Sequence, residues 1–470
     1  MAFSEVQALR IRQGLAGLWL VIILSLFRDP LTPALTGPDS PFPALAVGPK
    51  DCVVVQDHCI HEVSYALGAP IYWGLLLPVL IAVLFLFGHE FWRRVCPLSF
   101  FSQIARNLDW VRRRPAVSKD GKAAAAAKPA KMRPDSFVAK NHFYLQFGLF
   151  YLAVCARILF VNSSRITLAC FLLAFILASV IVGFLYDGKT WCQYFCPVAP
   201  VEEFYTGPRG LFASKAHLRS NSKLKVTQSM CRTLPSDDGL EKSNCVACKS
   251  NCIDIDAEKK YWLELMEPRK QQLAYGYAGL VIGYFAYYFF YSGNWWYYFS
   301  GLWSHEADQN ANLLKSGLYL AGHTLPIPKL LAVPLVIGLS IVIVYWLGVR
   351  IESTLVERLQ RGPSPLTPET VRHRCLTVVT VAIFNLFFVF GGHSFLYMLP
   401  HFFHVYVPAI LCGLSGLWLY RTWKRTPADY SQEVVADKRS QRKVPTGQDL
   451  NRVPVSPRSL YGPPPRPRHD

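Results

Sequence analysis

Four cysteines lie in one polar segment with the spacing of an iron–sulfur ligand set. Three of them, Cys245, Cys248 and Cys252, form a C-x2-C-x3-C box, and Cys231 lies upstream. Bacterial ferredoxins hold a cubane cluster with the related run C-x2-C-x2-C-x3-C-P. The first position of that run is Lys242 here, so we assign the fourth ligand to Cys231. Structural zinc is the alternative, because zinc also takes four thiolates.

Three further cysteines lie in or beside Cys-Pro units. WCQYFCP contains Cys192 and Cys196, and HEFWRRVCP contains Cys96 alone. Both units follow apolar runs that would cross a membrane in the same direction, so we expect the three thiols to converge at one depth. With His89 or His142 they would form a second metal centre. Alternatively, Cys192 and Cys196 are reduced thiols or a reversible dithiol, and Cys96 is a packing residue.

The cysteine segment lies between apolar runs long enough to span a membrane. Of the 470 residues, 52% are hydrophobic and 17% are charged, whereas soluble proteins carry about 25% charged residues. A spanning helix needs about 20 apolar residues. These features predict an all-α polytopic membrane protein with about eight transmembrane helices and a small cytoplasmic ferredoxin-like iron–sulfur segment. The predicted runs are 9–27, 70–92, 143–162, 166–186, 272–292, 329–349, 376–398 and 403–420.

The basic residues orient these helices. If both termini are cytoplasmic, the inner segments hold nearly all of the 49 Lys and Arg residues, as the positive-inside rule requires. We therefore expect a multi-pass protein of the bacterial inner membrane, with the cysteine segment on the reducing side, where disulfides are rare. The net charge of +18 is explained by these loops, so we expect membrane lipid as a partner and no nucleic acid.

The predicted helices divide the chain into four regions. After the cysteine box, apolar residues three and four apart in 261–266 predict a short amphipathic helix. The C-terminal tail is rich in Pro and Arg and has too few apolar residues to form a core. The regions are helices one to four with a basic linker at 93–140 (1–186), the iron–sulfur segment (187–271), helices five to eight (272–421) and a disordered tail (422–470).

Two acidic residues, Glu202 and Glu203, follow the second Cys-Pro unit. They are candidates for proton transfer. The alternative is that they favour a helix N-terminus or pair with nearby Arg.

Histidines gather on the predicted outer side. His393 is expected within the seventh span, and His401 and His404 begin the eighth, one turn apart. One hypothesis is haem b, with His393 and His404 as axial ligands. Another is a quinol site, where a neutral imidazole accepts a proton. The alternative is that these side chains snorkel or hydrogen-bond backbone carbonyls at the membrane interface.

The predicted outer loops contain two cysteines and an aromatic cluster. Cys52 and Cys59 are expected to form a disulfide on the oxidising face; with His58 and His61 they would otherwise bind copper or zinc. The aromatic residues of 295–303 are expected at headgroup level, as a membrane belt without a site.

The two Cys-Pro units followed by a cysteine box resemble the membrane polyferredoxin family. Its members include the quinol dehydrogenase subunit of periplasmic nitrate reductase, the nitrous oxide reductase regulator and the cytochrome oxidase accessory protein. The resemblance covers about residues 70–265. It implies [4Fe–4S] ligation by the four cysteines of the box and a redox role for Cys192 and Cys196. This chain has one complete box where family members commonly have two.

These features predict an inner-membrane [4Fe–4S] protein that transfers electrons at the cytoplasmic face, to or from quinone or a partner redox complex. Such a protein would be an oxidoreductase linked to quinol or ferredoxin. The alternative is a non-enzymatic accessory factor that reduces or delivers metal for the assembly of another metalloenzyme. A transporter is disfavoured because the apolar runs show no internal repeat.

Overall fold

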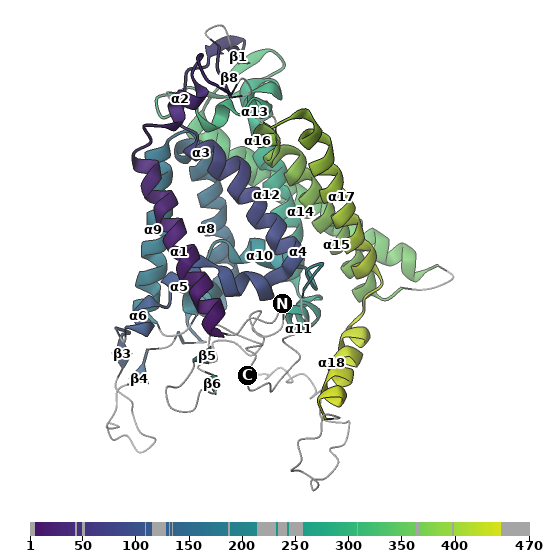
Figure 1. The fold of residues 1–470 in the computed structure, drawn as a ribbon. Coiled ribbons are helices and arrows are strands. Elements are labelled where there is room, and N and C mark those ends of the chain that lie inside the picture. Colours follow the sequence, from purple (N-terminus) through teal and green to yellow (C-terminus); the bar gives the residue numbers. More distant parts are fainter. Residues whose placement is uncertain are drawn as a thin grey trace.

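Long helices form one bundle with short elements at both ends (Figure 1). We call the end where Glu5 begins the first helix the N-terminal end, and the opposite end, which carries the strand β1, the hairpin end. The computed structural model describes residues 5–42, 45–48, 52–108, 110–114, 128–130, 132–133, 135–186, 189–213, 232–233, 242–243, 257–307, 309–362, 366–396 and 399–442.

Within those residues, eight helices are long and apolar enough to cross a membrane. Each predicted apolar run overlaps one of them, which confirms the prediction of about eight helices that could span a membrane. The third and fourth are joined by a tight turn, as their short separation in sequence requires. The helices are α1 (Glu5–Phe27), α3–η1–α4 (Gly68–Ile71, Tyr72–Leu76, Leu77–Val95), α8–η2 (His142–Ala156, Arg157–Val161), α9 (Arg165–Leu185), α12 (Pro268–Ser292), α14 (Lys329–Gln360), α15 (Pro368–Gly391) and α17 (His401–Trp423).

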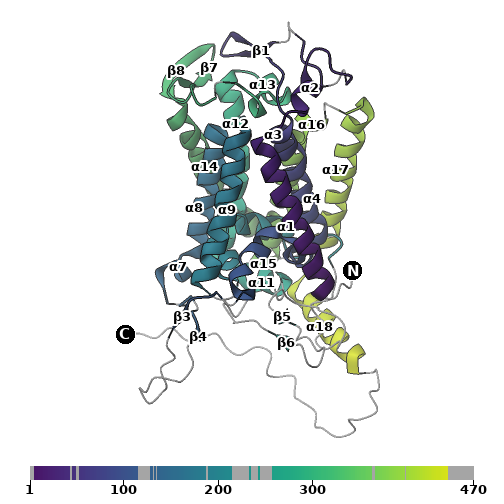
Figure 2. The same ribbon diagram turned by 60° about the vertical axis from the view of Figure 1, so that its left-hand side comes forward.

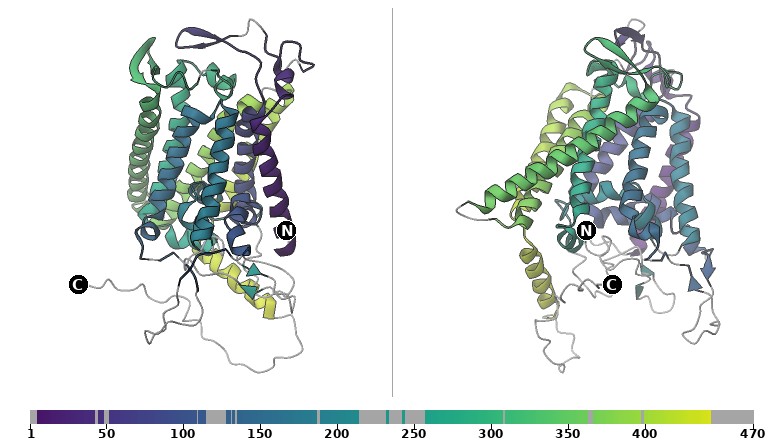
Figure 3. Two further views of the ribbon diagram at one scale, coloured as in Figure 1. Left: turned by 90° about the vertical axis from the view of Figure 1, so that its left-hand side faces the viewer. Right: turned by 180° about the vertical axis from the view of Figure 1, so that it is seen from behind.

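One of these helices, α14, is longer than the sequence predicted. The predicted run ends at 349, yet the helix continues to Gln360 and crosses the bundle obliquely (Figure 3, right). The extension is polar, but its Glu352 is buried against Arg372 of α15, with 2.7 Å between Oε1 and Nε. The ion pair with α15 therefore stabilises the polar C-terminal part of α14, which apolar composition alone does not predict.

The all-α prediction is correct for the bundle, and antiparallel strand pairs are added at its ends. At the hairpin end, the predicted disulfide between Cys52 and Cys59 is confirmed. Copper or zinc binding by those two thiols is therefore not supported. The pairs are β1 (Cys52–Val55) with β2 (His58–His61), β3 (Arg113–Arg114) with β4 (Lys128–Pro129), β5 (Arg232–Thr233) with β6 (Lys242–Ser243), and β7 (Ser316–Leu320) with β8 (His323–Pro328).

The predicted aromatic belt at 295–303 is wrong for three of its residues. Tyr297, Tyr298 and Trp303 are buried, because α13 (Trp296–Phe299) and η5 (Leu302–Ser304) fold back over the end of α12. The Tyr298 ring stacks on Trp303, with 5.4 Å between ring centroids, and lies 4.9 Å from Tyr288 of α12. These side chains therefore extend the core beyond the end of α12. Trp295 and Trp296 remain exposed.

The start of the C-terminal tail is helical, which corrects the prediction of disorder from 422 onward. α18 (Pro427–Arg442) follows α17 and projects from the N-terminal end (Figure 2). Arg425, in the turn between them, pairs with Glu433 at 3.1 Å and also with Glu258. These charged partners help to order a segment that has few apolar residues. Residues 443–470 lie outside the described part of the chain.

Within its described residues, the basic linker at 93–140 contains three short helices. They are α5 (Pro97–Phe101), α6 (Ile104–Asn107) and α7 (Phe137–Lys140). Most of the stretch between α6 and α7 lies outside the described residues.

Candidate functional site

The structure describes both ends of the segment that contains the predicted cluster ligands. The part of the chain before this segment forms α10 (Ala199–Thr206), and the part after it forms α11 (Ala257–Glu264). The helix α11 is the predicted amphipathic helix, and its Tyr261 is buried. Between them, β5 and β6 pair antiparallel, with Arg232 opposite Ser243. The four predicted ligands, Cys231, Cys245, Cys248 and Cys252, lie outside the described residues.

An ion-pair cluster joins the two ends of this segment. Glu203 of α10 lies 2.5 Å from Lys260 of α11 and 2.8 Å from Lys270 of α12. Lys260 also pairs with Glu264 at 2.9 Å. Burial alone would raise the pKa of Glu203, but the two ammonium groups hold that pKa well below its ordinary value. Glu203 is therefore an anion at neutral pH that ties α11 to α10 and α12. The predicted alternative was pairing with nearby Arg, whereas its partners are the lysines Lys260 and Lys270.

The two Cys-Pro units have the same local backbone. Cys96 ends α4 with φ −60° and ψ 118°, and Cys196 ends η3 (Trp191–Phe195) with φ −62° and ψ 116°. A residue before proline avoids the α region, so each helix ends at its cysteine. A short helix follows directly or after a brief turn, α5 in one unit and α10 in the other. The similarity between the two sequence runs is therefore also a similarity in shape.

The structure brings Cys96, Cys192 and Cys196 into one neighbourhood. Burial raises the pKa of the Cys96 thiol, and Glu202 and Cys192 raise it further. Burial likewise raises the pKa of Cys196, with contributions from Glu202, Cys192 and Cys96. Both thiols are therefore held in the protonated form at neutral pH. In the described ranges no group of three or more His, Cys, Asp or Glu side chains is arranged to hold a metal ion, and the second metal centre stays a prediction.

Glu202 is the polar centre of this neighbourhood. Its Oε1 accepts a 2.7 Å hydrogen bond from Trp92 Nε1, and its Oε2 lies 3.2 Å from His89 Nδ1. His89 and His142 were the two histidines considered as a further ligand of the second metal centre. Of these, His89 is the one that contacts Glu202. His142 instead lies 2.8 Å from the carbonyl of Ala139 through Nδ1 and 3.2 Å from an Arg269 nitrogen through Nε2.

A break in α4 places His89. Gly88 has φ 71° and ψ 179° inside that helix, a conformation that is essentially restricted to glycine. The freed carbonyls of Phe85 and Leu86 accept hydrogen bonds of 3.3 and 2.6 Å from the amides of Leu211 and Phe212. The backbone that follows α10 therefore supplies the hydrogen bonds that the broken helix lacks, as non-helical backbone at membrane depth requires. The apolar run predicted at 70–92 therefore contains a break at Gly88.

The histidines at the hairpin end lie near one another. His393 follows the end of α15 and begins α16 (His393–Leu396), so its predicted place inside the seventh span is wrong. Burial lowers its pKa, and the neighbouring His404 lowers it further. The rings of His401 and His404 are 5.4 Å apart, and His404 Nε2 lies 3.1 Å from the carbonyl of Leu399. For His404, that contact matches the alternative that these histidines hydrogen-bond backbone carbonyls. The binding of haem or quinol stays a prediction.

A cation inside the bundle was not recognised as important from the sequence. The guanidinium of Arg157 lies 3.9 Å from the Trp73 ring centroid, 4.8 Å from Tyr284 and 5.5 Å from Trp303. Its Nε donates a 3.1 Å hydrogen bond to Asn162. Aromatic faces stabilise a cation electrostatically. A lone Arg in an apolar run was the available signal, but its partners are distant in sequence.

No known protein family, curated protein or solved structure matches this chain. The functional proposal therefore depends on the residues and contacts of the chain itself.

Proposed function

We propose that this chain is an integral inner-membrane [4Fe–4S] protein that transfers electrons at the cytoplasmic face. The observation that carries the proposal is the set of Cys231, Cys245, Cys248 and Cys252 in one segment between two spanning helices. Thiolates with this spacing match the donor set of a cubane cluster, and a bound cluster would accept and release an electron.

The pairing of β5 with β6 supports the choice of Cys231 as the fourth ligand. Antiparallel partners lie about 5 Å apart at their Cα atoms, and Arg232 is the partner of Ser243. Cys231 is the residue before Arg232, and Cys245 is two residues after Ser243. Chain connectivity thus favours both thiolates within reach of one cluster.

The ion pairs around Glu203 support a fixed position for the segment against the bundle. Its return helix α11 is tied to α10 through Lys260 and to α15 through a 2.8 Å contact between Tyr261 OH and His373 Nδ1. We propose that this N-terminal end faces the cytoplasm, because the segments between helices there hold most of the Lys and Arg residues. A cluster at this place would lie close to the membrane surface, where a quinone or a partner redox protein could exchange electrons with it.

Visible absorption and electron paramagnetic resonance (EPR) of the purified protein test the proposal. We expect an anaerobic preparation in detergent to be brown, with a broad visible band that dithionite bleaches and an EPR signal in the reduced state. One cubane signal would fit the box alone, and two would show that Cys96, Cys192 and Cys196 hold a second centre. A colourless preparation with stoichiometric zinc would contradict the proposal.

A further inference from the structure

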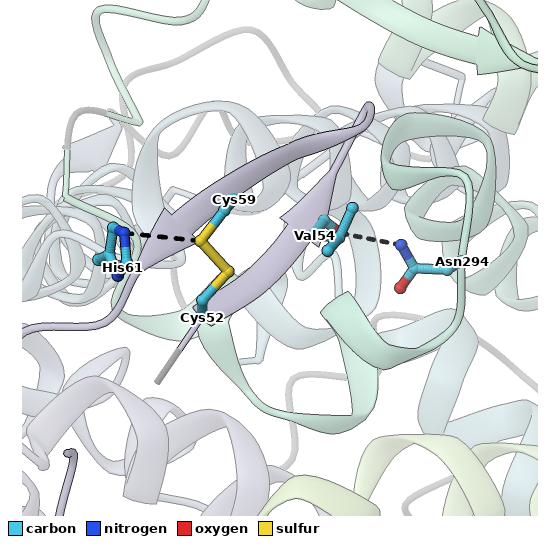
Figure 4. Close-up of a disulfide and its surroundings, with 5 residues drawn as sticks. All are labelled: Cys52, Val54, Cys59, His61 and Asn294. Carbon is cyan, nitrogen blue, oxygen red and sulfur yellow. Dashed lines mark hydrogen bonds between the residues drawn. A yellow bond between two sulfur atoms is a disulfide. The ribbon is translucent and has the colours of Figure 1, made fainter. Parts of the chain in front are cut away.

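The disulfide at the hairpin end lies on an exposed face beside a histidine. In the β1–β2 hairpin, Val54 is opposite Cys59 and Cys52 is opposite His61. Because side chains alternate along a strand, these four residues share one face. Val53 and Val55, on the other face, are buried. Cys59 and His61 are exposed, with the His61 ring beside the Cys59 sulfur (Figure 4).

Contacts other than the disulfide hold this hairpin in place. Gln56 lies in the turn, and its backbone N–H donates to the Ser292 carbonyl at 3.0 Å. Its side-chain Nε2 donates to the Tyr291 carbonyl at 3.0 Å and to the Ser316 carbonyl at 3.1 Å. Asn294 Nδ2 donates to the Val54 carbonyl at 2.8 Å (Figure 4). Together with burial of one strand face, these bonds fix the hairpin to the bundle. The disulfide can therefore open without release of the hairpin.

The contact between His61 and Cys59 favours the departure of Cys59 as a thiolate. His61 Nε2 lies 3.6 Å from Cys59 Sγ. An imidazole N–H at this distance stabilises a thiolate on Cys59. A thiol whose thiolate is stabilised is a better leaving group in thiol–disulfide exchange. His58, on the same strand, shares the exposure of His61 but lies on the opposite face of the hairpin, paired with Val55.

We propose that Cys52–Cys59 is a thiol–disulfide exchange site for a protein dithiol or a pair of small thiols. A substrate thiolate attacks the exposed Cys59 Sγ, the S–S bond breaks, and Cys52 leaves as a thiolate that takes up a proton. A second substrate thiol, deprotonated to its thiolate, then attacks the substrate sulfur of this mixed disulfide. Cys59 leaves as a thiolate that His61 stabilises. Two electrons pass to the hairpin, two protons end on its thiols, and the substrate leaves as a disulfide.

Glutathione, as a membrane-impermeant small thiol, tests this site in sealed vesicles with the hairpin end outside. The measurement is the rate at which Cys59 becomes labelled by an impermeant maleimide, read by peptide mass. We expect His61→Phe to slow this rate several-fold, and His58→Phe to leave it at the wild-type value. Equal rates in all three proteins, or a wild-type bond that glutathione does not reduce, would overturn the proposal.

A second variant tests the order of attack. Cys52→Ser leaves Cys59 free, and we expect oxidised glutathione to form a mixed disulfide with it faster than with Cys52 in Cys59→Ser. The reverse order would overturn the assignment of Cys59 as the attacked sulfur. The site does not depend on the proposed cluster, so an iron-free protein would leave these outcomes unchanged.

Discussion

Replacing Glu203 by Gln removes one negative charge from the cluster that ties α11 to the bundle and keeps the shape of the side chain. Lys270 then loses its 2.8 Å partner, whereas Lys260 keeps Glu264 at 2.9 Å. The side chains of Glu203 and Lys270 are 18% and 7% exposed, so water cannot fully compensate the change. Breaking a buried pair costs about 3–5 kcal/mol. Because Lys260 remains paired, we expect about 3 kcal/mol, the lower end of that range.

Unfolding in detergent, followed by intrinsic fluorescence against temperature or denaturant, measures this loss. Glu267→Gln is the matched control, because Glu267 is exposed at the turn between α11 and α12, and we expect it to change the free energy of unfolding by less than about 0.5 kcal/mol. A loss below about 1 kcal/mol in Glu203→Gln, the value typical of exposed pairs, would refute the buried ion-pair account.

The pH dependence gives an independent check. Lys260 and Lys270 outweigh the effect of burial and depress the pKa of Glu203 in the folded state below its ordinary value of 4.5. A carboxylate with a depressed folded-state pKa contributes stability above its unfolded-state pKa and loses it as the pH falls through the folded-state pKa. The difference between wild type and Glu203→Gln should therefore stay constant at neutral pH and shrink only in acid. A difference that grows on acidification would contradict this sign.

Two further substitutions test how the bundle is built, both by unfolding in detergent. Glu352→Ala should lower the free energy of unfolding by about 3–5 kcal/mol, because it leaves the Arg372 guanidinium without its carboxylate partner. Glu357→Ala, at an exposed position of the same helix, should have little effect. Gly88→Ala should cost about 1–3 kcal/mol, because its φ is 71° and a Cβ would lie 3.1 Å from the Gly210 amide. Gly148→Ala, with open space around it, should be neutral or stabilising. Equal effects in either matched pair would contradict the argument.

The spanning helices could be predicted because each needs only a run of apolar residues of the right length. The Cys52–Cys59 disulfide followed from its place on the predicted oxidising face. The shared shape at Cys96 and Cys196 followed from the proline after each cysteine. All of these are local properties of the chain.

What the sequence did not reveal depends on partners far along the chain. The break at Gly88 is tolerated because Leu211 and Phe212 donate to the freed carbonyls, and nothing near Gly88 in sequence indicates this. α18 is ordered in part by the pairing of Arg425 with Glu258, a residue 167 positions earlier. Composition indicated disorder there because it records few apolar residues and not their charged partners.

The central claim is that the Cys231–Cys252 segment holds a [4Fe–4S] cluster. Its most direct test is iron and acid-labile sulfide per chain in anaerobically purified wild type, in Cys248→Ser, and in Cys170→Ser, an exposed free cysteine of α9 that serves as control. We predict about four irons and four sulfides in the wild type and the control, and their loss in Cys248→Ser. An iron content in Cys248→Ser equal to that of the wild type, or zinc in place of iron in the wild type, would contradict the account.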